Sequence, residues 1–157
     1  DITVNESDLV AITVNASDLD SDSLTFFYSS PINSSGMWQT DYNFAGSYRV
    51  NVTVSDGQYN ATETFNITVL DVNRAPVISS LMPANNSVFN ETDVINIIAS
   101  ASDPDNDTMI YSIKIDGKEA STNNSYQWIT GYEDAGLHTI RATVSDGKST
   151  ASKEHAL

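Results

Sequence analysis

Apolar and polar residues alternate along several short stretches of the chain, with the two-residue period of a β-strand. In residues 50–54, three valines alternate with Asn51 and Thr53, and the same period recurs in residues 65–69 and 140–144. Successive side chains of a strand point to opposite faces, so these runs predict strands that are buried on one side. Glycine-containing turn signals separate the runs, and no stretch has the 3.6-residue period of an amphipathic helix. The pattern predicts an all-β sandwich fold.

The sequence also contains an internal repeat. Residues 5–24 align without gaps with residues 90–109 at an offset of 85, and residues 38–57 align with residues 128–147 at an offset of 90. The difference between the two offsets predicts a loop insertion in the second copy. Each copy has the size of one small sandwich, about 80 residues. We therefore expect two tandem β-sandwiches, one in residues 1–73 and one in residues 74–157.

The boundary between the copies lies at the sequence Asp-Val-Asn-Arg-Ala-Pro, residues 71–76. Pro76 cannot donate a ladder hydrogen bond and favours an extended Ala75, which predicts a short, stiff linker. Residues 76–83 of the second copy have only residues 1–4 as their counterpart in the first. The second copy stops inside the strand that closes the first. We expect a truncated first strand in repeat 1 and a truncated last strand in repeat 2, each completed by a flanking repeat or a neighbouring subunit.

Composition and charge exclude several classes of function. The formal net charge is −14, from 21 acidic and 7 basic residues, so the chain has no basic surface for nucleic acid. No apolar run approaches the roughly 18 residues that span a bilayer, which argues against direct membrane insertion. The chain contains no cysteine and therefore no disulfide. We expect bound calcium, glycans or adjoining repeats to supplement the two small cores.

The order of motifs resembles the PKD-like and cadherin-like Ig-fold repeats of archaeal and bacterial cell-surface proteins. In the second copy these motifs are Glu91, residues 101–107 (Ala-Ser-Asp-Pro-Asp-Asn-Asp), Asp116-Gly117, Asp134-Ala135-Gly136 and Val-Ser-Asp-Gly at 144–147. The first copy has Glu6, residues 16–22, Phe44-Ala45-Gly46 and residues 54–57 at the matching places. The resemblance implies an Ig-like fold and an extracellular or cell-surface location. It leaves the function open among spacers, adhesion modules and coat-forming domains.

Acidic residues recur at alternate positions of one loop in each copy. Closely spaced carboxylates suit calcium, although the glycine and distal glutamate of an EF-hand are missing. The alternative is an ordinary polar loop in which aspartates form Asx-turns. The resemblance to cadherin-like repeats implies further ligands at the loop before each last strand and at the joint between the copies. The candidate calcium ligands are Asp18, Asp20, Asp22, Asp56, Glu6, Asp71, Asn73, Asp103, Asp105, Asp107 and Asp146.

Glycosylation sequons of the form Asn-x-Ser/Thr are more frequent than the composition of the chain accounts for. Asn51 and Asn66 occupy the outward phase of their expected strands, where a glycan would not enter the core. We therefore expect N-linked glycans at several of these sites, with composition bias as the alternative. The ten candidate sites are Asn5, Asn15, Asn33, Asn51, Asn60, Asn66, Asn85, Asn90, Asn106 and Asn123.

The sequence favours a structural function over a catalytic one. His138 and His155 lie in expected strands and no nucleophile motif is present, so we expect no enzyme. Trp38 and Trp128 recur at matching positions, which favours core packing over a sugar-stacking platform. The leading hypothesis is a structural module of a glycosylated surface layer, sheath or filament, whose partners are neighbouring repeats or identical subunits. The alternative is a calcium-stiffened adhesion or carbohydrate-binding module.

Overall fold

The computed structural model describes all 157 residues, and every regular element in it is a β-strand. The chain divides into two compact units, Asp1–Val72 and Asn73–Leu157, which are called repeat 1 and repeat 2 below. This division falls beside the boundary that the repeat and the proline predict. The expected all-β class with tandem Ig-like sandwiches is confirmed. No helix has the length and apolar character needed to cross a bilayer.

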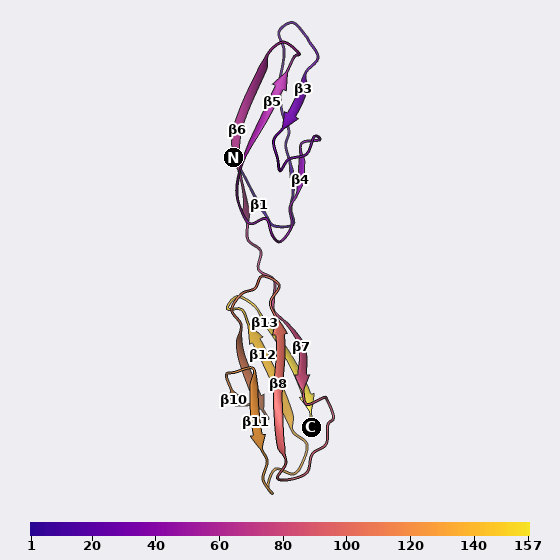
Figure 1. Ribbon diagram of the computed structural model, residues 1–157, viewed down its shortest axis with the longest axis vertical. Helices are drawn as coiled ribbons and strands as arrows, with labels where there is room; N and C mark the ends of the chain where they lie inside the picture. The colour runs from indigo at the N-terminus through magenta and orange to yellow at the C-terminus, as the bar shows by residue number, and fades with distance from the viewer. The chain divides into compact units, whose positions relative to one another are not determined.

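Repeat 1 consists of two sheets (Figure 1). The larger sheet has the strand order β1-β6-β5-β3, in which β1 runs parallel to β6 and the other pairs are antiparallel. The smaller sheet is the antiparallel pair β2-β4. The strand bounds are β1 Ile2–Asn5, β2 Leu9–Ala11, β3 Thr25–Tyr28, β4 Met37–Gln39, β5 Gly46–Ser55 and β6 Asn60–Leu70.

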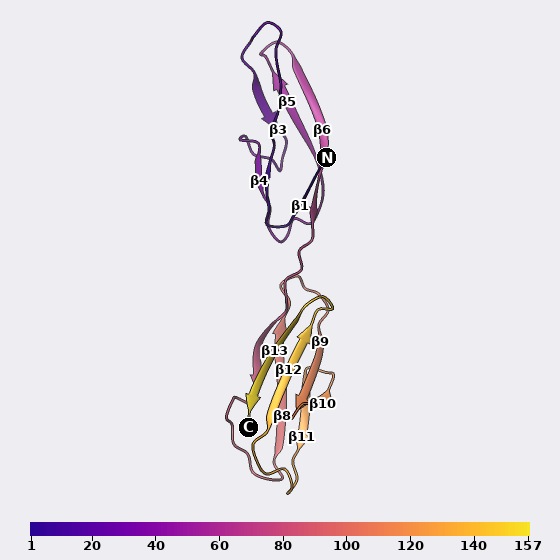
Figure 2. The ribbon, with the colours of Figure 1, turned by 180° about the vertical axis from the view of Figure 1, so that it is seen from behind.

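Repeat 2 has one sheet in the order β10-β9-β12-β13 and a second in the order β11-β8-β7. Figures 1 and 2 show these two sheets as the two faces of the sandwich. The strand bounds are β7 Val77–Met82, β8 Val94–Ser102, β9 Ile110–Ile115, β10 Lys118–Ser121, β11 Ser125–Ile129, β12 Thr139–Ser145 and β13 Thr150–Ala156.

The five-residue insertion of repeat 2 contains regular structure, where the sequence predicted a loop. Strand β10 pairs with β9 across the turn at Asp116 and Gly117, both of which have positive φ. Tight hairpins of this kind favour Asp-Gly because the backbone enters the left-handed region. At the end of the chain, β13 pairs with β12 along its full length, from Thr139↔Ala156 to Ser145↔Thr150.

Each repeat has its own apolar core, made by the inward positions of the alternating strands. In repeat 1, Trp38 lies in this core and makes edge contacts with the rings of Phe44 and Tyr48. The buried residues of the core cluster in repeat 1 are Val10, Ile32, Trp38, Val50, Ile67 and Val69. Those of repeat 2 are Leu81, Ile95, Ile97, Ala99, Ile113, Ile140 and Ala142, with Trp128 packed against them.

The two repeats differ most along one strand. Strand β8 covers nine residues and lies between β11 and β7, whereas the aligned segment of repeat 1 forms only the three-residue strand β2, paired with β4 alone. Repeat 1 has no strand at the place that β7 occupies in repeat 2. A strand segment with no hydrogen-bonded neighbour lacks the ladder that would hold it extended. Residues 13–18 therefore form no regular element in repeat 1.

Candidate functional site

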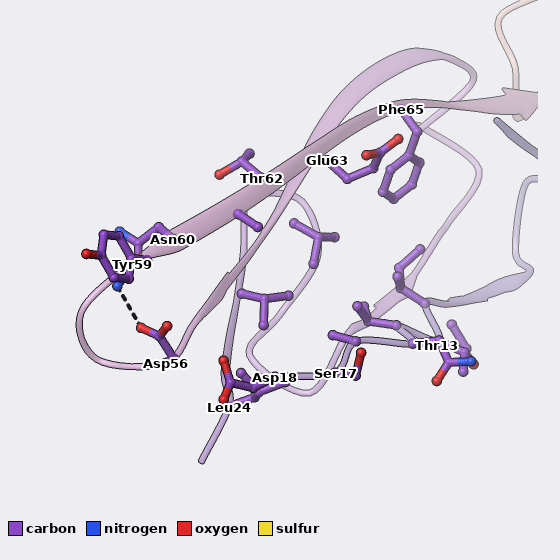
Figure 3. A pocket seen from close by; sticks show the side chains of 18 of the residues that line it. Thr13, Ser17, Asp18, Leu24, Asp56, Tyr59, Asn60, Thr62, Glu63 and Phe65 are labelled. Atoms are coloured by element: carbon purple, nitrogen blue, oxygen red, sulfur yellow. Dashed lines mark hydrogen bonds between the residues drawn. The ribbon is translucent and has the colours of Figure 1, made fainter. Parts of the chain in front are cut away.

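An open groove of about 750 Å³ lies in repeat 1 (Figure 3). One wall is formed by residues 11–18, directly after β2, and the other by residues 59–63 and Phe65 of the β5–β6 hairpin. In Figure 3, Thr13, Ser17 and Asp18 lie on one side, while Glu63 and Phe65 project from the ribbon on the other. The floor of the groove is apolar, because Val52, Val54 and Ile12 line it.

The rim of the groove is acidic. Its charged lining residues are Asp1, Asp18, Asp56 and Glu63, and no lysine or arginine lines it. Asp56 accepts hydrogen bonds from the backbone N–H groups of Tyr59 and Gln58. These bonds, that from Tyr59 above all, hold the pKa of Asp56 below its ordinary value. The groove therefore combines an apolar floor with an acidic rim.

The acidic loop of repeat 1 is held by an Asx-turn. The Oδ1 atom of Asp18 accepts backbone N–H bonds from Asp20, at 2.9 Å, and from Asp22, at 3.0 Å. Asp103 makes the same contacts in repeat 2 with the N–H groups of Asp105 and Asp107. The turn that was the alternative interpretation of these aspartates is therefore present in both repeats.

The acidic loop of repeat 2 has basic partners, which the sequence pattern did not predict. Asp105 accepts the backbone N–H of Arg74 at 2.6 Å and also pairs with its guanidinium, whose Nη2 lies 2.6 Å from Oδ1. These contacts lower the pKa of Asp105, with the backbone hydrogen bond as the largest contribution. Lys148 lies 3.7 Å from Asp107. Arg74 directly follows Asn73 in the linker. Its positive charge was the feature of the sequence that could have predicted the contact with the acidic loop.

The side chain of Asn73 makes contacts at the same end of repeat 2 as Arg74. Its Nδ2 donates to Asp146 at 2.8 Å, and this bond is the largest of the effects that lower the pKa of Asp146. Two oxygen atoms at this end are buried and accept no hydrogen bond, namely Oδ1 of Asn73 and Oδ2 of Asp103. Buried acceptors without a donor are uncommon and costly in folded proteins. These two atoms are therefore the strongest local candidates for cation ligands.

The predicted calcium ligands do not form a preformed coordination site. No three acidic or histidine side chains gather closely enough to hold a metal ion. Asp18 and Asp56 line the same groove, as expected from their two loops, while Asp20 and Asp22 are exposed. The grouping of Glu6 with Asp71 and with residues of the second repeat stays a prediction.

Glu6 has a structural position within repeat 1. The side chain is only 4% exposed, and its two oxygens accept the backbone N–H groups of Ala45 and Val72, each at 3.0 Å. A buried carboxylate with two such bonds satisfies donors that would otherwise be orphaned. Glu6 therefore ties the end of β6 to the loop that precedes β5.

The two repeats have different side chains at one aligned position, Tyr48 in repeat 1 and His138 in repeat 2. The hydroxyl of Tyr48 donates to the carbonyl of Phe44 at 2.9 Å. His138, at the aligned position of repeat 2, places Nε2 3.0 Å from the carbonyl of Asp134 and Nδ1 2.7 Å from Asp116. Both ring nitrogens thus face acceptors, which favours the doubly protonated imidazolium.

All ten sequon asparagines are exposed. Asn51 and Asn66 lie on the outward phase of β5 and β6, as the alternation predicts. Asn15 lines the groove and is exposed. Attachment of a glycan at any of the ten sites is therefore sterically open.

Comparisons with known proteins agree with this fold. Residues 76–151 match the sequence profile of the family described as bacterial Ig domain. Human protocadherin-24 EC1-2 superposes with a TM-score of 0.51 at 17% identity, over 99% of this chain and 89% of that chain. The fibronectin(III)-like modules of Clostridium thermocellum CbhA give a TM-score of 0.46 at 16% identity, over 99% of this chain and 87% of that chain. A search of curated protein sequences found no match.

The family match covers most of repeat 2, and the protocadherin likeness, at its low identity, bears on the fold alone. The narrower resemblance to PKD-like repeats of archaeal or bacterial surface proteins stays a prediction. The chain is a tandem pair of Ig-like β-sandwich repeats, and its second repeat matches the bacterial Ig domain family.

Proposed function

We propose that the chain is a structural, non-catalytic repeat module of a glycosylated extracellular surface assembly: a surface layer, sheath or filament. The observation that carries this proposal is the placement of the sequons. Ten Asn-x-Ser/Thr sites in 157 residues all have an exposed asparagine. The number of sequons exceeds what the composition of the chain accounts for, and none of their asparagines is buried. A surface that can carry many glycans suits a permanent extracellular coat.

The alternative of a carbohydrate-binding module finds less support in the two repeated tryptophans. Trp38 is buried and packs against Phe44 and Tyr48, and Trp128 is half-buried beside His138, with the ring centroids 5.0 Å apart. Trp38 is therefore not available for stacking on a sugar ring, and Trp128 is only partly exposed. The surface assembly remains the function that the geometry supports best.

The experiment is glycopeptide mass spectrometry of the native protein, combined with electron microscopy of the native material. We expect glycans on several of the ten asparagines and a regular lattice, sheath or filament. Native material that consists of dispersed monomers without glycans would contradict the proposal. Recombinant chain from a host without N-glycosylation serves as the mass control.

We propose calcium as a structural ligand of repeat 2 only. Oδ2 of Asp103 and Oδ1 of Asn73 lack donors, and oxygen atoms of this kind are the ligands that calcium prefers. The ion would supply the positive charge that a buried carboxylate needs. Arg74 and Lys148 already serve Asp105 and Asp107, which leaves Asp103 as the central ligand.

Thermal unfolding with and without EDTA tests the calcium proposal. Calcium is expected to raise the unfolding temperature of repeat 2 and to lose this effect in Asp103→Asn, whereas Asp18→Asn, the matched change in repeat 1, leaves it intact. An unfolding temperature that neither EDTA nor added calcium changes would show that the loop is a plain Asx-turn.

A further inference from the structure

The outward face of one sheet of repeat 2 carries no charge. This face belongs to the adjacent strands β11, β8 and β7 (Figure 1), and none of their residues is acidic, basic or a histidine. The other sheet of the same repeat has Lys114, Arg141 and Glu154 side by side across three strands. In a chain with a net charge of −14, the first face is therefore distinct.

The exposed side chains of this uncharged face include two apolar pairs. Val94 of β8 lies opposite Ile129 of β11, and Ile98 of β8 lies opposite Met82 of β7. Each of these four side chains is between 44% and 70% exposed. Exposed apolar residues that gather in one place mark interaction sites, whereas scattered ones need no explanation.

The core of repeat 2 does not require these residues. Ile95 and Ile97 point inward from β8 and belong to the core cluster, whereas Val94 and Ile98 have the outward phase. A strand that faces the core on one side and water on the other has polar residues on its outer side. Strand β8 departs from this pattern at two outward positions.

No sequon asparagine lies on these three strands. The four sequons of repeat 2 are at Asn85, Asn90, Asn106 and Asn123, each beyond the end of a strand. By contrast, β5 and β6 of repeat 1 carry three sequon asparagines within the strands themselves. Glycans on repeat 2 would therefore be attached around the uncharged face and not on it.

We propose that this face of repeat 2 binds the same face of a second copy of the chain. Each copy has a net charge of −14, so two copies meet with least repulsion through a face without carboxylates. A cationic partner would gain more at the acidic loops than on this neutral face. The inference rests on the proposed function, because it names a contact between copies in the surface assembly.

A two-fold axis that crosses β8 at Asn96 gives a self-complementary contact. Sheets that pack face to face lie about 10 Å apart with nearly aligned strands. With the axis perpendicular to β8, Val94 of each copy packs on Ile98 of the other, because both are two residues from Asn96. The two Asn96 amides meet at the axis, where they can hydrogen-bond to each other.

The size of the face determines the strength of this contact. A strand of nine residues is about 30 Å long and three strands are about 14 Å wide, so the face covers about 400 Å². A stable pair of proteins buries about 800 Å² per partner. We therefore expect a weak dimer in isolation, which repetition along an assembly would strengthen.

Sedimentation equilibrium of the unglycosylated 157-residue chain tests the proposal, in EDTA and from about 10 μM to about 1 mM. We expect a reversible dimer that predominates at the highest concentration. Added sodium chloride should increase the dimer fraction, because it screens the repulsion between the copies. EDTA excludes calcium bridges between acidic loops. A chain that stays monomeric throughout would overturn the proposal.

Charge substitutions make the result specific to the face. Val94→Glu and Ile98→Lys are each expected to weaken dimerisation at least about tenfold, because each buries two unpaired charges. An equimolar mixture of the two variants should associate again, since the introduced carboxylate of one copy then meets the introduced ammonium of the other. A mixture that stays monomeric would contradict the two-fold arrangement.

Leu9→Glu is the matched control, because Leu9 is the exposed residue of repeat 1 that aligns with Val94. It should leave the dimer unchanged, and all three variants should keep the unfolding temperature within a few degrees of the parent chain. A dimer that Leu9→Glu weakens as much as Val94→Glu does would place the contact elsewhere and overturn the proposal.

The proposed function and this contact can fail separately. A chain that does not dimerise leaves a glycosylated native lattice in place, which would then be assembled through other contacts. Dispersed native monomers without glycans contradict the surface assembly, whereas the dimer of the purified chain and its sensitivity to Val94→Glu are measured independently of that result.

Discussion

His138 is a titratable residue at a position that repeat 1 fills with a neutral tyrosine. The hydrogen bond with Asp116 is the main cause that raises the pKa of His138, and burial opposes it with a smaller effect. Asp116 and Asp134 face the ring, and Glu91 lines the same hollow. The protonated ring satisfies both acceptors, so protonation of His138 is coupled to the stability of repeat 2.

We expect the unfolding temperature of repeat 2 to fall as pH rises from about 6 to about 8.5. A raised folded-state pKa gives a contribution that is complete below the unfolded value of about 6.5 and is lost as pH passes through the folded value. The loss should be a few degrees, because a partly exposed pair contributes at most about 1 kcal/mol. Thermal unfolding across this pH range measures it. His138→Tyr, which copies repeat 1, should flatten the dependence, and a slope that survives in this variant would contradict the assignment.

Substitution of Glu6 is expected to have a larger effect than substitution of His138. Glu6→Ala leaves the N–H groups of Ala45 and Val72 without acceptors, so we expect a loss of roughly 2–4 kcal/mol in the free energy of unfolding of repeat 1. Glu6→Gln should be milder, because one carbonyl oxygen remains. Urea denaturation checks both variants. Glu91→Ala is the matched control in repeat 2, where the glutamate is exposed, and an equal loss there would show that burial is not the cause.

At the scale of elements, the sequence predicted a strand correctly where apolar and polar residues alternate within the segment itself. The valines of residues 50–54 alternate visibly, and β5 contains them. Residues 9–17 carry nearly the same pattern as β8, yet only Leu9–Ala11 is a strand. A segment with this pattern forms a strand only where neighbouring strands pair with it. The local sequence pattern contains no information about those neighbours. The pairing of Arg74 with Asp105 also escaped prediction, because it depends on where the linker enters the sandwich.

We therefore expect strand β7 to stabilise repeat 2 through the buried side chain of Leu81. Leu81→Ala removes a buried side chain from the core of repeat 2, and we expect it to cost about 2–5 kcal/mol. Val77→Ala, in the same strand but more than half exposed, should change stability by less than about 0.5 kcal/mol. Chemical denaturation of both variants gives the comparison. A loss in Leu81→Ala as small as that expected for Val77→Ala would mean that β7 stabilises the repeat through its backbone ladder and not through the Leu81 side chain.

At the scale of the whole molecule, negative charge is unevenly divided between the repeats. Repeat 1 has ten acidic residues and a single base, Arg49, whereas repeat 2 has eleven acidic and six basic residues. Like charges on a small sandwich repel one another and destabilise the compact state. Repeat 2 offsets part of this repulsion with Arg74 and Lys148 on its acidic loop. Repeat 1 has only Arg49 to offset its ten acidic residues, so we expect its stability to depend more on ions in the solvent.

Raising sodium chloride from about 10 mM to about 0.5 M, which shortens the Debye length from about 30 Å to a few ångströms, should stabilise repeat 1 more than repeat 2. Hydrogen exchange followed separately for the two repeats resolves the effect. Calcium chloride at the same ionic strength separates screening from ligation, because a bound ion should add stability only in repeat 2, through Asp103. Equal responses of both repeats to sodium would mean that the charge imbalance has no energetic consequence. An extra calcium effect in repeat 1 would place ligation at Asp18 and Asp56 instead.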